Sequence, residues 1–149
     1  MNAVLLNIIF QGWPEEVALI FTALAVLGVT SPLKKIVWYG LILTLVIWSI
    51  RILSIPFGMH LLATILGLAL IVYKETKVSV GVSFFATFIA TFLLISSETL
   101  VHLVIQKLFG NIGMPQGWSW VIAGWPQILM MIGWGLIIKK FIRPFVLSK

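Results

Sequence analysis

Long apolar stretches separated by short polar or charged segments are the main pattern of this chain. Five such stretches lie at about residues 14–29, 36–53, 57–73, 78–109 and 120–142. A helix of about 20 apolar residues crosses the roughly 30 Å hydrocarbon core of a bilayer. The pattern therefore predicts an all-α, polytopic membrane bundle of five transmembrane helices, forming a single domain over residues 1–149.

Turn residues and charges mark the bounds of these stretches. Pro14, followed by Glu15 and Glu16, suits the first turn of a helix, because proline lacks an N–H that this turn does not need and acids favour a helix N-terminus. Residues 1–11 are apolar but short, and they lack the basic start and cleavage site of a secretory signal. We expect them to form a brief interfacial helix on the outer face.

Composition strengthens the membrane assignment. Hydrophobic residues make up 61% of the chain and charged residues only 9%, whereas soluble domains carry about 25% charged residues. There is no cysteine, which excludes disulfides, thiolate metal sites and a cysteine nucleophile. Small residues within 78–109, and Gly133 and Gly135, predict close helix packing in either a monomer or a homo-oligomer.

Basic residues concentrate in alternate loops and so predict an orientation. Eight of the ten Lys and Arg residues lie after the first or third stretch or around the end of the fifth: 34, 35, 74, 77, 139, 140, 143 and 149. Only Arg51 and Lys107 fall on the other side. Because cytoplasmic loops are enriched in Lys and Arg, we expect the N-terminus outside and the C-terminus inside. The net charge of +6 then reflects topology and contact with anionic lipid, and we expect no nucleic-acid partner.

Polar residues within the stretches point to a shared site. A charged side chain at mid-helix costs roughly 3 kcal/mol on insertion scales, so it normally faces protein or water. Glu98 and His102 lie four residues apart and share a helix face. Their positions along the stretches place several polar side chains in the outer half of the bilayer, and Glu16 lies at the same depth. We therefore predict an outward-facing ligand pocket formed by Glu15, Arg51, His60, Glu98, His102 and Gln127.

Three other interpretations of these residues stay open. Arg51 could simply neutralise Glu98 or Glu15 within the bundle. His60, Glu98 and His102 match a facial metal-binding set, but the spacing is unspecific and we expect neither a metal nor a cofactor. His102 beside Glu98 could act as an acid–base pair, but no nucleophile elbow, HExxH or phosphate-binding motif is present, so we expect no enzyme.

Two short motifs carry a family resemblance. Ile-Pro-Phe-Gly-Met-His at 55–60 and Trp-Pro-Gln-Ile-Leu-Met at 125–130, with the multi-helix layout, resemble the membrane sensor region of Gram-positive histidine kinases. The resemblance implies detection of an external ligand and a helix movement passed to the cytoplasm. Residues 1–149 contain no kinase module, so we expect a stand-alone relative that acts through a membrane or cytoplasmic protein partner.

These observations predict a non-enzymatic sensor or regulatory subunit in a cell membrane, with a bacterial cytoplasmic membrane as the expected location. The alternative is a small transporter or channel component, proton-linked through Glu98 and His102. A relay needs a polar route to both faces, and the stripe continues inward through Thr91, Thr87 and Ser83. That stripe has no ionisable group, which favours a one-sided pocket.

Overall fold

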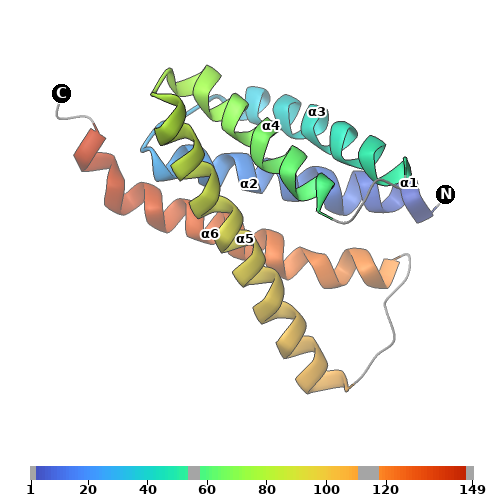
Figure 1. The fold of residues 1–149 in the computed structure, drawn as a ribbon. Helices are drawn as coiled ribbons and strands as arrows, with labels where there is room; N and C mark the ends of the chain where they lie inside the picture. The colour runs from blue at the N-terminus through green and yellow to red at the C-terminus, as the bar shows by residue number, and fades with distance from the viewer. Residues whose placement is uncertain (1–2, 54–57, 111–117, 147–149) are drawn as a thin grey trace.

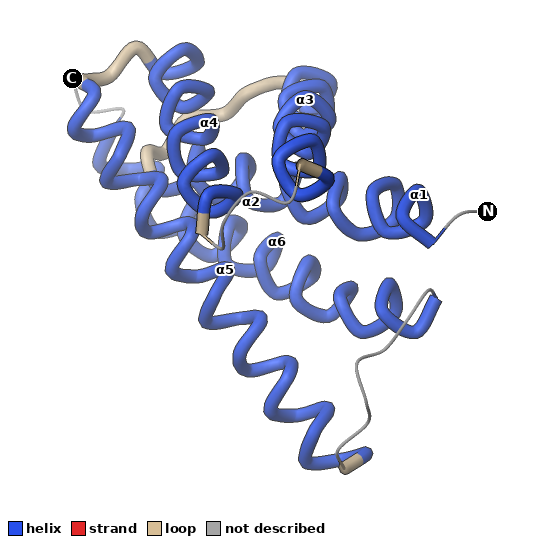
Figure 2. Tube along the Cα trace, turned by 45° about the vertical axis from the view of Figure 1, so that its right-hand side comes forward, coloured by secondary structure: helices blue, strands red, loops and turns tan. Residues whose placement is uncertain are grey.

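The computed structural model describes residues 3–53, 58–110 and 118–146, and it is helical, with no strand in these ranges (Figure 2). Five helices of the described part are long and apolar enough to cross a membrane, which indicates a multi-pass membrane protein and agrees with the predicted fold class. The elements are α1 (Ala3–Asn7), the π-helical turn η1 (Ile8–Gly12), α2 (Trp13–Val26), α3 (Leu33–Ile52), α4 (Met59–Thr76), α5 (Val80–Phe109) and α6 (Trp118–Val146).

The first candidate span is longer at its start than the sequence indicated. α1, η1 and α2 run on as one helix, because the junction residues Asn7 and Gly12 both have right-handed helical backbone angles. The candidate span is therefore Val4–Val26, of 23 residues. A separate helix over residues 1–11 does not appear in the described part, and an interfacial position for its first turns stays a prediction.

A π turn explains how the helix passes Pro14 without ending. The Trp13 N–H donates to the Ile8 carbonyl, five residues earlier. Proline inside an α-helix crowds the carbonyl four residues before it and offers no N–H in return. A wider turn just ahead of Pro14 relieves that crowding, so the chain stays helical through a sequence that reads as a helix start.

The α2 helix forms the centre of the bundle and contacts α3, α4, α5 and α6 (Figure 1). Its middle is apolar on all sides, as expected of a helix surrounded by others. Ala18, Leu19, Ile20, Ala23 and Leu24 are each no more than 1% exposed. Because α2 lies among the other four spans, the polar residues near its start face those spans.

Glycines allow the helices to approach closely at three crossings. A Cβ at Gly40 of α3 would lie 2.5 Å from Val17 of α2, and one at Gly135 of α6 would lie 2.6 Å from Phe21. A Cβ at Gly67 of α4 would lie 2.6 Å from a Leu43 methyl. Small residues at membrane helix interfaces serve this purpose. Gly133 differs, because nothing lies within 4 Å of its Cβ position.

Two polar contacts fix α2 against its neighbours. The Thr22 hydroxyl lies 2.9 Å from the Ala18 carbonyl and 3.0 Å from the Met131 carbonyl of α6. The Trp13 indole N–H donates to the Val37 carbonyl of α3 at 3.0 Å. Interhelical hydrogen bonds of this kind contribute about 0.6 kcal/mol on average in a membrane.

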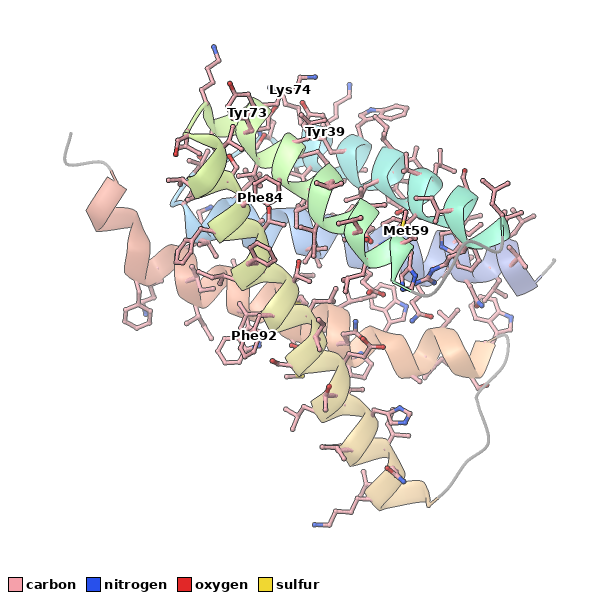
Figure 3. All side chains as sticks on the ribbon, in the orientation of Figure 1. Tyr39, Met59, Tyr73, Lys74, Phe84 and Phe92 are labelled. Atoms are coloured by element: carbon pink, nitrogen blue, oxygen red, sulfur yellow. The ribbon has the colours of Figure 1, made fainter. Side chains whose placement is uncertain are left out.

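The α2–α3 and α4–α5 connections and the end of α6 lie at one end of the bundle, which we call the basic end (Figure 1). There the Glu75 carboxylate accepts hydrogen bonds from the Ser31 and Tyr39 hydroxyls, both at 2.8 Å, and pairs with Lys35 at 3.5 Å. The Lys74 ammonium lies over the Tyr39 ring, 5.7 Å from its centroid. Figure 3 shows Tyr39, Tyr73 and Lys74 at this end. The grouping of basic loops thus agrees with the predicted alternation.

Candidate functional site

A polar cavity of about 360 Å³ lies towards the end of the bundle opposite the basic end. The α4 helix connects the two ends: His60 near its start lines the cavity, and Glu75 near its finish belongs to the basic end. Figure 3 shows the same separation, with Met59 far from Lys74. The lining residues are Asn7, Gln11, Gly12, Glu15, Glu16, Thr44, Ile47, Trp48, Arg51, His60, Glu98 and Gln127. All five candidate spans contribute at least one of them.

The first helix supplies the largest share of the polar lining. Asn7, Gln11 and Glu15 follow one another at intervals of four, so a continuous helix presents them on one face. Glu16 is next to them and is buried, at 9% exposure. Because α2 is central, this face looks towards the other spans and not towards lipid.

Electrostatic contacts join the first span to three others. The side chains that act electrostatically on Glu15 are Glu98 on α5, Arg51 on α3 and Gln127 on α6. Glu16 experiences the charges of Glu15 and Arg51. The cavity therefore brings together five of the six residues predicted for the pocket: Glu15, Arg51, His60, Glu98 and Gln127.

His102 is the predicted pocket residue that the structure places elsewhere. It does not line the cavity, and its side chain is exposed. The α5 helix crosses the bundle obliquely and its last part leaves the other helices (Figure 1). One further turn advances about 5.4 Å along the axis, which takes His102 past the cavity edge. Glu98, itself exposed, marks that edge.

The metal interpretation of His60, Glu98 and His102 has no support in this arrangement. Within the described residues, no group of three or more His, Cys, Asp or Glu side chains is placed to hold a metal ion. The reason is again the angle of α5, because His102 leaves the cavity that His60 and Glu98 share. The acid–base pairing of Glu98 with His102 loses its shared cavity for the same reason.

Arg51 does not neutralise the cavity carboxyl groups by direct contact. Its guanidinium lies over the Trp48 ring, 5.5 Å from the centroid, a cation–π arrangement. In the part of the chain that the structure describes, the direct ion pair is the one between Lys35 and Glu75 at the basic end. Arg51 therefore acts on Glu15 and Glu16 through space while stacked on an aromatic ring.

Four polar or aromatic lining residues were not predicted: Asn7, Gln11, Thr44 and Trp48. Asn7, Gln11 and Glu15 are spaced by four residues, so one continuous helix places them on one face. A separate helix over residues 1–11 does not predict this shared face. Asn7 Oδ1, Gln11 Oε1 and Glu16 Oε2 are buried and have no hydrogen-bond partner among the described residues. Buried polar atoms are normally paired, so these three acceptors are available to a bound molecule.

Several hydroxyl groups are buried along α5, outside the cavity lining. Ser97, Thr91 and Thr87 are between 0 and 4% exposed. Their hydroxyl oxygens have no hydrogen-bond partner in the described ranges. Further along, the Ser83 hydroxyl donates to the Ser79 carbonyl at 3.2 Å. The inner part of the polar stripe predicted on this helix, at Ser83, Thr87 and Thr91, is therefore buried, whereas its outer part at Glu98 and His102 is exposed.

A second concavity, of about 500 Å³, has a different character. It lies along α2, α3 and α6 and includes Trp13, Val17, Phe21, Trp125 and Ile132 among its lining residues, none of which is ionisable. Such a surface suits hydrocarbon chains and offers a polar ligand little. The polar cavity is therefore the candidate functional site.

Comparison with known proteins finds no matching family model, no similar curated protein and no similar solved structure. The resemblance to sensor regions of histidine kinases accordingly stays a prediction from the sequence. Function has to be inferred from the cavity and from its position relative to the basic end.

Proposed function

We propose that this protein is a non-enzymatic membrane sensor or regulatory subunit whose polar cavity binds a ligand from the outer side. The observation that carries the proposal is the convergence of all five candidate spans on one polar cavity. A ligand held there contacts helices that also reach the basic end. Binding can therefore change their relative positions at that end, which by the positive-inside tendency faces the cytoplasm.

Two helices provide the physical connection. The α3 helix carries Trp48 and Arg51 at the cavity and Tyr39 at the basic end, and α4 carries His60 at the cavity and Glu75 at the basic end. The Tyr39–Glu75 hydrogen bond joins the two helices where a partner would sense them. A rigid tilt of α3 against α4 caused at the cavity would alter this contact, and a cytoplasmic protein or a second copy would respond to it.

Spin-label distance measurements test the coupling without a known ligand. The cysteine-free chain allows labels at Lys34→Cys and Lys139→Cys, on α3 and α6 at the basic end, in nanodiscs. Glu98→Gln changes the charge at the cavity edge, and we expect it to shift the distance distribution between the labels. His102→Ala is the matched control, one turn further along α5 and outside the cavity, and it should leave the distribution unchanged.

Glu16→Gln provides a second variant inside the cavity. If neither Glu16→Gln nor Glu98→Gln alters the distances, while both proteins remain folded by circular dichroism, the cavity is not coupled to the basic end. The sensor proposal would then be wrong. A shift with His102→Ala equal to that with Glu98→Gln would also contradict it, because a general effect on α5 would explain both.

A proton-linked transporter is the second candidate, and the buried hydroxyl groups on α5 favour it. Unpaired hydroxyl groups at Thr87, Thr91 and Ser97 would support a chain of water molecules leading away from Glu98. Proteoliposomes with a trapped pH indicator decide between the candidates. Proton flux above that of empty liposomes, abolished by Thr87→Val with Thr91→Val, would establish the transporter; its absence is the result expected for the sensor.

A further inference from the structure

The unpaired atoms of the polar cavity are all hydrogen-bond acceptors. Asn7 Oδ1, Gln11 Oε1 and Glu16 Oε2 are buried and lack partners among the described side chains and backbone. A buried acceptor left without a donor is unfavourable. A ligand that presents hydrogen-bond donors would recover this cost, whereas a ligand made of acceptors would add to it.

Glu16 is the most constrained of these groups. Its side chain is 9% exposed, so bulk water does not surround its carboxyl group. The Gln11 side chain packs against Gly124 of α6, because a Cβ at that glycine would lie 2.5 Å from its amide nitrogen and 2.7 Å from its amide carbon.

Most of the ionisable groups that line the cavity are acidic. Three carboxyl groups, from Glu15, Glu16 and Glu98, line it against the single guanidinium of Arg51, with His60 as the other ionisable group. Arg51 is stacked on Trp48 and makes no direct ion pair with the acids within the described residues. Acidic groups therefore outnumber basic groups in the cavity, and a cation placed among them would favour their ionised form.

The size and spread of the carboxyl groups point to an organic cation and not to a bare metal ion. The cavity volume of about 360 Å³ falls within the 300–1,000 Å³ typical of small-molecule sites. In the described part of the chain, the acids are not grouped closely enough with other ligating side chains to share one metal ion. Acceptors distributed around such a volume match donors distributed along a small molecule.

We propose that the ligand of the polar cavity is a small organic cation that carries ammonium or guanidinium groups. This inference rests on the proposed sensor function and specifies its ligand class. Glu16 and the amide oxygens of Asn7 and Gln11 accept N–H hydrogen bonds from the cation, while the carboxyl groups of Glu15 and Glu98 lie around it and ionise in its presence. Charge-assisted hydrogen bonds are about twice as strong as neutral ones, which favours the cation over a neutral molecule of equal size.

Calorimetric titration of the full chain in nanodiscs of zwitterionic lipid tests the proposal, because such lipid does not itself attract polyamines. The probe is putrescine, and 1,4-butanediol is its neutral counterpart of the same length. We expect saturable binding of putrescine and none of butanediol. Glu16→Gln should weaken putrescine binding about tenfold or more, equivalent to about 1.4 kcal/mol, and Glu98→Gln should weaken it less. His102→Ala should bind as the unmodified chain does.

Three other results would each contradict the proposed ligand class. Putrescine with three methyl groups on each nitrogen keeps both positive charges but has no N–H donors. If it bound as tightly as putrescine, the role of the acceptors would be overturned. Binding of a lysine-containing peptide in preference to both putrescine and agmatine would replace the small cation with a peptide. No binding of putrescine or agmatine to folded protein would overturn the proposal. The spin-label test uses no ligand, so a shift with Glu98→Gln would leave the sensor function standing after such a failure.

Discussion

The contact between Gly40 of α3 and Val17 of α2 offers the sharpest test of the packing at the centre of the bundle. A Cβ at Gly40 would lie 2.5 Å from a Val17 methyl, 3.1 Å from the Val17 backbone nitrogen and 3.3 Å from its Cα. The methyl group can rotate away, but the backbone atoms cannot move without separating the two helices. Gly40→Ala should therefore force α3 away from α2.

The expected magnitude follows from two opposing effects. Adding a methyl to a closely packed interface typically costs about 1–3 kcal/mol. Alanine in place of glycine within a helix returns about 0.8–1 kcal/mol through helix propensity. Gly133→Ala in α6 is the matched control, because nothing lies within 4 Å of its Cβ position and only the propensity gain applies. The two variants should therefore differ in free energy of unfolding by about 1–3 kcal/mol.

Unfolding by dodecyl sulfate in mixed micelles, followed by tryptophan fluorescence, measures this difference. Gly135→Ala should fall between the other two, since its Cβ would meet the Phe21 ring at 2.6 Å and a ring can turn. Val17→Ala should recover part of the loss in Gly40→Ala, because it removes the methyl and leaves the backbone contact. Equal stabilities of Gly40→Ala and Gly133→Ala would show that α2 and α3 do not approach at this point.

Four further outcomes follow from other contacts. Thr22→Val, which removes the hydroxyl between α2 and α6, should cost about 0.5–1.5 kcal/mol in the same unfolding assay. Glu75→Ala leaves two hydroxyls without their acceptor and should cost about 1–3 kcal/mol, with Glu75→Gln less harmful; equal losses would count against those hydrogen bonds. A thiol at Lys140→Cys should react with impermeant reagents only from the cytoplasmic side of cells, and outside-only labelling would reverse the proposed orientation. Gly124→Ala should displace the flexible Gln11 side chain, weakening putrescine binding measured by calorimetry with little loss of stability.

The five-helix layout was predictable because hydropathy and length determine which segments can cross a bilayer. The same reasoning placed Glu15, Arg51, His60, Glu98 and Gln127 at one depth, and the cavity contains all of them. Depth depends mainly on position along a span, which the sequence displays directly. This part of the site could therefore be found without coordinates.

The two departures arise from tertiary geometry. His102 shares a helix face with Glu98, but the angle of α5 is set by packing against α2, α4 and α6, and no local pattern encodes it. Gly12, Trp13 and Pro14 looked like the start of a helix, yet a π turn carries the first helix through them. That continuity brings Asn7 and Gln11 into the cavity, which a separate interfacial helix would not do.

The cavity and the contacts that hold the bundle together involve different residues. The Gly40–Val17 approach, the Thr22 hydrogen bonds and the Glu75 cluster all lie outside the cavity lining. The acceptors Asn7 Oδ1, Gln11 Oε1 and Glu16 Oε2 have no partner among the described residues. A ligand that pairs them adds stability in proportion to the logarithm of its concentration over Kd. The polar groups of the cavity are thus the ones through which binding can shift the balance between helix arrangements, as the proposed sensor requires.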